Sequence, residues 1–222
     1  MYRRRASAAN MTGLHFDERY DERIDLADGG VLRLRLVGPE DKGLILEGFA
    51  RLSPETRYRR FFSTKRGLSA DELRYFTEFD GKNHLAICAV QVRPDGSEKG
   101  IGIARFVRVP EEPVVAEAAV VVADEFQKRG LGRLLLLRLI AAARERGVER
   151  FRAMTLAENP AARALITELG GQPRATLGDD TLSVEVALPD APRDGAEMSA
   201  SKLYRLFQAV ARGIADVIQI HG

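Results

Sequence analysis

The segment 116–133 brings together residue types that could hold a phosphate group. A run of small and β-branched residues predicts a buried strand, and Gly130 and Gly132 follow it just before an apolar stretch that predicts a helix. The N-terminus of a helix presents unpaired backbone N–H groups and a partial positive charge, and both attract anions. Arg129 and Arg133 place full positive charges beside the same turn. The segment therefore predicts a phosphate-binding turn between a strand and a helix.

Two other kinds of phosphate loop do not fit this segment. No Lys-Ser or Lys-Thr pair follows the glycines, as a P-loop requires, and the glycines lack the spacing of a dinucleotide site. Glycines spaced in this way also form ordinary tight turns, so a turn without a ligand is the alternative.

Length and composition limit the classes to which the chain can belong. Its 222 residues suffice for one well-cored domain with appendages, and 45% hydrophobic with 30% charged residues is typical of a soluble protein. The 34 basic and 32 acidic residues nearly cancel, which argues against nucleic acid or an anionic membrane as a partner. The single cysteine, Cys88, excludes an internal disulfide and a cysteine-rich zinc site, and the three histidines show no metal-ligand spacing. We therefore expect no metal.

The sequence shows no membrane or export signal. No segment has the unbroken apolar length of a membrane span, and the arginines at 3–5 are not followed by the apolar stretch of a secretory signal. A cytoplasmic location is the expectation.

Three parts of the chain differ in composition. Residues 1–25 are polar and lack apolar periodicity, which predicts a flexible N-terminal segment. Residues 26–190 carry the strand and helix patterns of one mixed α/β domain. Residues 191–222 begin with a linker, after which apolar residues recur at steps of three and four, as in an amphipathic helix. That apolar face must be covered by its own domain or by a second copy of the chain, which would make a homo-oligomer.

Hydrophobic periodicity and turn residues predict the order of elements in the domain. The expected elements are a strand at 31–36, a helix to 51 opened by 38–41, helices starting at 53 and at 69, strands at 84–92 and 99–109 around a turn at 94–97, a strand at 114–123, a helix at 130–146, a strand at 151–157, a short helix from 159 and a strand at 181–188.

The spacing Gln127-x-x-Gly130-x-Gly132, directly after an apolar strand, resembles the pyrophosphate loop of the GNAT acyltransferases. The order of elements from about 26 to 188 is similar to a GNAT domain, which implies an α/β (α+β) fold with a mixed, mostly antiparallel central sheet flanked by helices. Within that family, the segment 53–62 resembles a helix of bacterial Pat-type protein lysine acetyltransferases. Glu117 lies ten residues ahead of Gln127, where those enzymes have a general base.

The resemblance also implies how acetyl-CoA, the co-substrate, would bind. The backbone of Val120, Val121 and Val122 would pair with the pantetheine arm. The residues implied around the pyrophosphate are Gln127, Lys128, Arg129, Gly130, Leu131, Gly132 and Arg133. Asn159 would lie near the CoA arm, although asparagine at this position also serves as an ordinary helix N-cap.

Two residues depart from the family pattern. Lys128 stands where many relatives have glycine, and Ile166 stands where many small-molecule enzymes of the family have a tyrosine that protonates the departing thiolate. Solvent, or the proton released by the amine, would have to serve instead of that tyrosine.

Acetyl transfer from a thioester needs a neutral amine, and Glu117 is the candidate base that would remove the proton from the amine. Deprotonating a lysine with a pKa of about 10.4 costs roughly 4.6 kcal/mol at pH 7, so a base matters most for lysine-like acceptors. If Glu117 is buried between Val115 and Ala119, desolvation raises its pKa towards neutrality. The alternative is an ion-paired carboxylate on an exposed face. Glu111 and Glu112 lie in a proline-flanked loop and are weaker candidates.

We therefore expect an acetyl-CoA-dependent N-acetyltransferase that transfers the acetyl group to a primary amine, preferentially a protein lysine, with Glu117 as general base. A small-molecule amine acceptor and a catalytically silent acyl-CoA-binding module are the alternatives. The sequence does not identify the acceptor, the acyl chain, the oligomeric state or any regulation.

Overall fold

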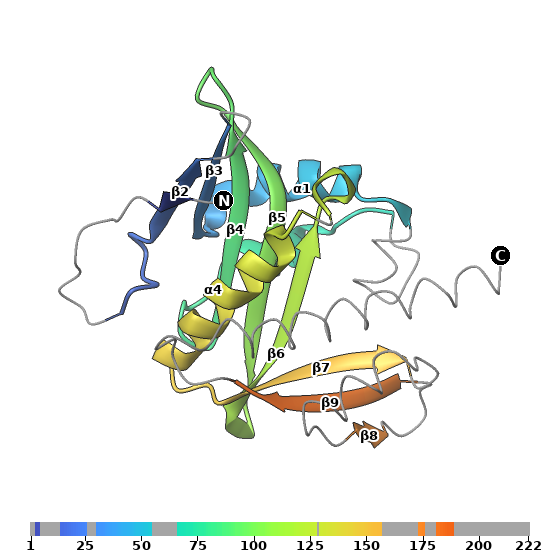
Figure 1. Cartoon of the computed structure of the whole chain (residues 1–222). Helices are drawn as coiled ribbons and strands as arrows, with labels where there is room; N and C mark the ends of the chain where they lie inside the picture. Colours follow the sequence, from blue (N-terminus) through green and yellow to red (C-terminus); the bar gives the residue numbers. More distant parts are fainter. Residues whose placement is uncertain are drawn as a thin grey trace.

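The fold is built on one large mixed sheet. The computed structural model describes residues 3–4, 14–25, 30–54, 66–127, 129–156, 173–175 and 181–188. Within these residues, nine strands are arranged in the order β1-β2-β3-β4-β5-β6-β7-β9-β8 (Figure 1). Neighbouring strands are antiparallel except β6 and β7, which are parallel. The predicted α/β fold with a mixed, mostly antiparallel sheet is confirmed.

The bounds of the elements agree with most of the expected ones. The strands are β1 (Arg3–Arg4), β2 (Asp21–Asp25), β3 (Val31–Leu36), β4 (His84–Val92), β5 (Glu98–Val109), β6 (Glu112–Val122), β7 (Arg150–Leu156), β8 (Pro173–Ala175) and β9 (Thr181–Ala187). The helices are α1 (Lys42–Arg51), α3 (Ala70–Thr77) and α4 (Leu131–Glu145), with short 3-10 helices η1 (Pro39–Asp41) and η2 (Asp124–Phe126).

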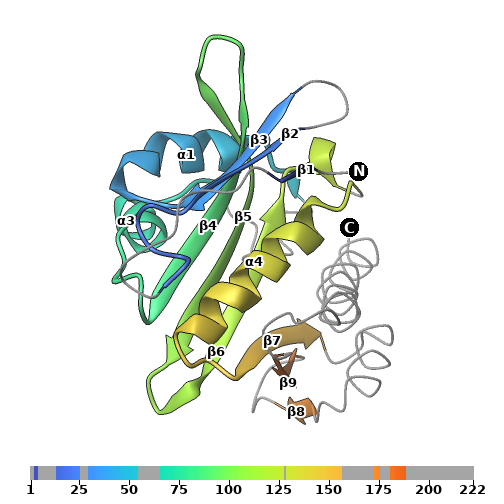
Figure 2. The ribbon, with the colours of Figure 1, turned by 60° about the vertical axis from the view of Figure 1, so that its left-hand side comes forward.

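Helices cover both faces of the sheet. α4 lies across one face, and α1 and α3 lie on the other (Figure 2). Side chains of β4 alternate between the two layers: Leu85 and Ile87 belong to the core under α4, whereas Ala86 and Cys88 belong to a smaller core on the side of α1. A strand that is covered on both faces reads as a continuous apolar run, as β4 does.

Glycines with a left-handed backbone define both ends of α4. Gly130, the residue before the helix, has φ +83°, and Gly147, just after it, has φ +75°. Residues with a Cβ atom are strained at these angles, so glycine is required there. Between the glycines, buried residues such as Leu135 and Leu139 recur along one stripe that packs on the sheet.

The N-terminal residues 14–25 are part of the domain, which corrects the expectation of a flexible segment through residue 25. Phe16 and Tyr20 are buried, with exposed fractions of 2% and 6%, and β2 pairs along its length with β3. β2 has no apolar alternation because one of its inward residues is Glu22, whose carboxylate accepts hydrogen bonds from Tyr20 at 2.8 Å and from Arg138 of α4 at 2.6 and 2.8 Å. An acid that is neutralised by a distant arginine gives no hydrophobic signal in the sequence.

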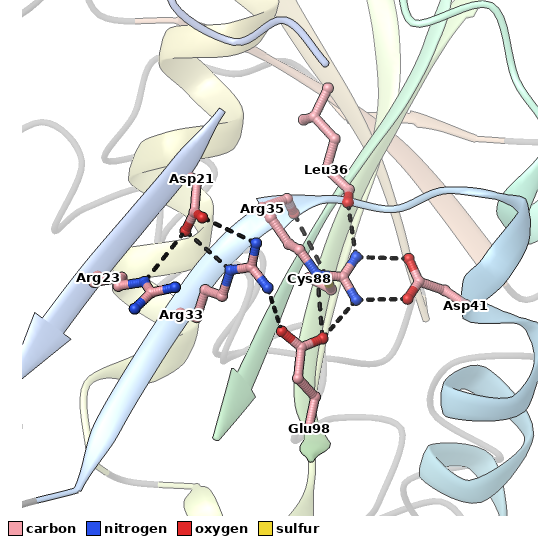
Figure 3. Close-up of polar contacts among 8 residues, drawn as sticks. All are labelled: Asp21, Arg23, Arg33, Arg35, Leu36, Asp41, Cys88 and Glu98. Atoms are coloured by element: carbon pink, nitrogen blue, oxygen red, sulfur yellow. Dashed lines mark hydrogen bonds and ion pairs between the residues drawn. The ribbon is translucent and has the colours of Figure 1, made fainter. Parts of the chain in front are cut away.

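A network of ion pairs joins β2, β3, η1 and the start of β5 (Figure 3). Arg35 holds both carboxylate oxygens of Asp41, at 2.6 and 2.8 Å, and also contacts Glu98 at 2.7 Å. Arg33 bridges Asp21 at 2.9 Å and Glu98 at 2.6 Å. Burial alone would raise the pKa of Glu98, but the hydrogen bonds from Arg35 and Arg33 outweigh it, so this pKa is lowered.

Several predicted elements fall outside the described residues. These are the helix expected from residue 53, the short helix from residue 159, the C-terminal amphipathic helix, and the domain boundary near residue 190. Among the residues that are described, no helix has the length and apolar character that crossing a membrane demands.

The Glu98 carboxylate should stabilise the fold in a pH-dependent way. We expect Glu98→Gln to lower the free energy of unfolding by about 1–3 kcal/mol at pH 7, because Arg33 and Arg35 lose a charged acceptor. Since the pKa of Glu98 lies below its ordinary value of 4.5 in the fold, this stabilisation is present above that pH and is lost as the pH falls through the lowered pKa. Urea denaturation of the parent and of Glu98→Gln should show that the difference in their free energies of unfolding is smaller below pH 4 than at pH 7.

The exposed Glu47 of α1 provides the control, and Glu47→Gln should change stability by less than about 0.5 kcal/mol at either pH. A Glu98→Gln difference that stays constant on acidification would contradict the assigned role.

Candidate functional site

β6 and β7 separate in the middle of the sheet. They pair over three positions only, from Val115 with Arg150 to Glu117 with Arg152. Beyond Glu117, β6 stays paired with β5 as far as Val122, while β7 remains paired with β9 and diverges from β6 (Figure 1). Residues 118–122 therefore have one edge without a strand partner in the described part of the chain. An extended group could add to this edge through main-chain hydrogen bonds.

The turn after β6 is held by side-chain hydrogen bonds. The Gln127 side-chain amide donates to the carbonyl of Val122 at 3.1 Å and to the Asp124 carboxylate at 2.9 Å. The other carboxylate oxygen of Asp124 accepts from the N–H of Ser53, beyond the end of α1, at 2.8 Å. The side chain of Gln127 thus fixes the path of the turn towards α4, and Asp124 connects the turn to the layer of α1.

The N-terminus of α4 is open to an anion. Gly130 occupies the N-cap position, and within the described residues no side chain caps the helix and a Cβ atom added at Gly130 would meet no atom within 4 Å. The next two residues, Leu131 and Gly132, are buried, so the first turn is anchored in the core. The first N–H groups of a helix have no partner within it. This end therefore keeps the geometry that the glycine spacing predicts.

Cationic side chains lie around the same turn. Arg129 is exposed and stands over the ring of Phe126 at 5.6 Å, and Lys99 approaches that ring from β5 at 5.4 Å while pairing with Glu125 at 2.6 Å. Arg133 is partly exposed on the first turn of α4. The turn thus carries an excess of positive charge at its surface. Lys128, Asn159 and Ile166 lie outside the described residues.

Glu117 is exposed, which corrects the expectation that burial would activate it. Val115, two residues earlier on the same face of β6, is fully buried, but Glu117 lies at the point where β7 departs and is exposed. The same face carries Arg105 of β5, whose pKa is lowered by burial, with the charges of Tyr75 and Glu117 acting in the opposite direction. Desolvation is therefore not what could make Glu117 a base. Its distinguishing feature is its place at the fork between the strands.

The other acids near this fork are less suitable. Glu111 lies in the exposed turn between β5 and β6, and Glu112 is paired with Arg152 of β7, which also binds Glu185. Among the residues that the structure covers, no group of three or more His, Cys, Asp or Glu side chains could hold a metal ion.

A cavity of about 110 Å³ lies between the sheet and the layer of α1 and α3. Its walls are almost entirely apolar, and they include Ala119 and Val121 of β6, the strand with the free edge. Among the described residues, Arg105 is the one charged residue in the lining, and it was not among the candidate residues that the sequence indicates. An arginine at an alternating position of a strand reads as solvent-exposed, so the sequence offers no signal for its location.

Cys88 also lines this cavity, as a small core residue. It is 2% exposed, its thiol donates to the carbonyl of Arg35 at 3.5 Å, and burial raises the pKa of the thiol to about 12. Such a thiol is protonated and inert at neutral pH. Cys88 therefore acts as a packing residue. His84, half-buried at the start of β4, has its pKa lowered to about 4 by burial and by the charge of Arg105.

The forked sheet, with a glycine-led helix at the end of the free strand edge, defines a class of acyltransferase fold. The model of the acetyltransferase (GNAT) family matches residues 48–170, and the chain belongs to this family.

Three relatives show the likeness at different lengths. The acetyltransferase Pat of Mycolicibacterium smegmatis is 37% identical over 148 residues, which are 66% of this chain and 43% of that protein. The acetyltransferase PA5475 of Pseudomonas aeruginosa is 32% identical over 167 residues, covering 75% of this chain and 86% of the relative. The crystal structure of the GNAT domain of S. lividans PAT superposes with a TM-score of 0.64 at 28% identity, covering 78% of this chain and 99% of that one. The chain thus spans less than half of the M. smegmatis protein.

The thiol of Cys88 should be unreactive in the folded protein. When the folded protein is treated with 5,5′-dithiobis(2-nitrobenzoate) at pH 8, less than about a tenth of one equivalent of thionitrobenzoate per chain should be released in minutes. The thiol reacts slowly because it is buried and its pKa is raised. In guanidinium chloride one equivalent should be released, since the chain has one cysteine. Rapid reaction of the native protein would show that the cavity opens to solvent at Cys88.

Proposed function

We propose that this chain is an acetyl-CoA-dependent N-acetyltransferase that acts on a primary amine, and that the amine is a protein lysine. The observation that carries the proposal is a continuous path along the structure. It starts at Glu117, follows the free edge of β6, and ends at the uncapped N-terminus of α4. Membership of the GNAT family supports acetyl-CoA as the ligand of that path.

The residues present along the path fit coenzyme A. Main-chain N–H and C=O groups of Val120, Val121 and Val122 would hold the amide-bearing pantetheine arm as a neighbouring strand does. The first N–H groups of α4 would bind the pyrophosphate, with Arg129 and Arg133 supplying charge. Gln127 supports the turn through its bond to Val122. For Lys128 and Asn159, which lie outside the described residues, we propose contacts with coenzyme A on the family resemblance alone.

Gly130 tests the pyrophosphate site. We expect Gly130→Glu to raise the dissociation constant for acetyl-CoA about a hundredfold, because the variant strains the left-handed backbone and adds a carboxylate where the diphosphate would lie. Isothermal titration calorimetry measures this change.

Gly96 offers a matched control, because it has φ +82° and open space around its Cα but lies in the turn between β4 and β5. Gly96→Glu should cost similar stability and leave the affinity for acetyl-CoA within about twofold. If both variants bind acetyl-CoA as the parent does, the pyrophosphate lies elsewhere.

Glu117 would act on the acceptor amine at the surface of the protein. Its carboxylate takes a proton from the ammonium group, and the neutral nitrogen then attacks the carbonyl carbon of the thioester that bound acetyl-CoA supplies. The C–N bond forms, the C–S bond breaks, and the sulfur leaves as a thiolate that is protonated by solvent or by the proton released from the amine. The products are an amide and free coenzyme A.

The exposure of Glu117 supports a macromolecular acceptor. A lysine on the surface of another protein can reach an exposed carboxylate at the fork without entering a closed pocket. Deprotonating a lysine costs about 4.6 kcal/mol at pH 7, more than for an amine of lower pKa, so a positioned base contributes most to a lysine acceptor. The likeness to acetyltransferases of the Pat type points the same way.

Glu117→Gln separates catalysis from binding. We expect kcat/KM for acetyl transfer to a lysine-containing protein to fall by about 10²–10⁴, since the amide cannot take up a proton, whereas the affinity for acetyl-CoA stays within about twofold. Release of free coenzyme A measures turnover, and calorimetry measures binding. Glu111→Gln, a change of the same type in the nearby turn, should retain parental activity.

The outcomes distinguish the alternatives. Unchanged turnover in Glu117→Gln removes this residue from the mechanism. Transfer by the parent to small amines but not to proteins would assign a small-molecule acceptor. Acetyl-CoA binding without transfer to any amine would favour a catalytically silent binding module.

A further inference from the structure

Arg105 is a partly buried cation for which no hydrogen bond is found among the residues that the structure describes. Its Nη1 atom is shielded from solvent and makes no hydrogen bond, and its guanidinium carbon lies 4.8 and 4.9 Å from the ring centres of Tyr75 and Phe76. Burial lowers its pKa. Arg35 and Arg138, also withdrawn from solvent, both hold carboxylates directly. A guanidinium nitrogen that is shielded from water and lacks an acceptor is costly, and a carboxylate is the acceptor that commonly satisfies it.

The cavity around Arg105 indicates the chemical character of the group that could bind there. The cavity that Arg105 lines is otherwise walled by apolar side chains and glycines, so its occupant must be mostly aliphatic. A volume of about 110 Å³ has room for on the order of four non-hydrogen atoms, given that a water molecule takes up about 30 Å³. An acetyl group would contribute only a methyl carbon beyond its carbonyl. The cavity is larger than acetyl transfer requires.

Arg105 is also close to the proposed site of transfer. Arg105 of β5 pairs in register with Ala119 of β6, and the side chains of Ala119 and Val121 form part of the cavity wall. These residues belong to the stretch of β6 with the free edge. A short chain attached to a thioester on that edge would therefore need to pass over one strand to reach the guanidinium.

We propose that the cavity is an acyl subsite for a short dicarboxylic acid, whose far carboxylate pairs with Arg105 while its near carbonyl forms the thioester to coenzyme A. The inference rests on the proposed function and extends it from acetyl transfer to transfer of acyl groups such as succinyl. The transfer step is the same: a C–N bond forms, the C–S bond breaks, coenzyme A leaves, and the distal carboxylate is unchanged.

Charge favours the acyl group over the acceptor amine as the occupant. An ammonium group in the cavity would face the Arg105 guanidinium in a poorly solvated space, which is repulsive. The exposed Glu117 already offers an opposite charge to the amine outside the cavity. A neutral acyl chain would fill the apolar space but would leave Arg105 unpaired. A carboxylate at the end of the chain satisfies both conditions.

The test compares two thioesters of equal chain length on the full chain. Calorimetry should show that succinyl-CoA binds at least ten times more tightly than butyryl-CoA. In Arg105→Gln this ratio should fall towards one. Arg105→Lys, which keeps the charge but loses the planar fork of donors, should give an intermediate ratio. Thermal melting of each variant verifies that it is folded, and the comparison of thioesters on the parent protein needs no variant.

A control for general electrostatics is needed because succinyl-CoA carries one more negative charge. Arg74→Gln removes an arginine from the exposed side of α3, next in sequence to Tyr75, and should leave the ratio as in the parent. Equal binding of the two thioesters by the parent overturns the proposal. The proposal is also overturned if Arg105→Gln still binds succinyl-CoA more than ten times as tightly as butyryl-CoA. The positively charged turn before α4 would then account for the preference.

Two further results separate this inference from the proposed function. If acetyl-CoA itself does not bind, the coenzyme site is wrong and both fail. If acetyl-CoA binds and the parent transfers acetyl groups faster to 5-aminovalerate than to pentylamine, with that preference lost in Arg105→Gln, the carboxylate belongs to the acceptor. The acyl subsite is then overturned, while acetyl transfer stands.

Discussion

The site depends on the early separation of two parallel strands. β6 and β7 share three paired positions and then diverge, yet each keeps a full antiparallel partner on its other side, β5 and β9 respectively. Each strand therefore stays extended without the other, and only one row of backbone groups on β6 is left for another partner. These backbone groups need a hydrogen-bonding partner, because unpaired backbone groups are costly unless water or a ligand satisfies them. The position of Glu117, the approach to α4 and the wall of the cavity all follow from this fork.

Pairing of charge across layers holds the rest of the frame in place. Arg138 of α4 binds Glu22 of β2, Arg35 joins β3 to η1 and β5, and Asp124 connects the turn before α4 to Ser53 beyond α1. These contacts link segments that are far apart in sequence, and they fix the two helical layers relative to the sheet. Against this background of satisfied charges, Arg105 differs in having aromatic faces and a cavity for neighbours.

Local patterns predicted the elements that carry their own signal. Gly130 and Gly147 stand at left-handed positions, so the ends of α4 could be read directly, and the capping box of Ser69 and Glu72 marked the start of α3. β2 has no strand pattern in the sequence because its inward Glu22 is polar, and residues 14–20 lack apolar periodicity although Phe16 and Tyr20 pack in the core. In both cases the compensating partner comes from α4 or from another distant element, and no window of sequence contains it.

The sequence by itself determined the strand, the glycine turn and the helix that follows, because each depends on backbone angles and periodicity within a few residues. It also determined the acidic residue ten positions before Gln127. Only the tertiary structure decided that Glu117 is exposed, that Gln127 braces the turn, and that Arg105 faces an apolar cavity. Exposure and pairing depend on which helix covers which face of the sheet, and that is settled by contacts between residues that the sequence places far apart.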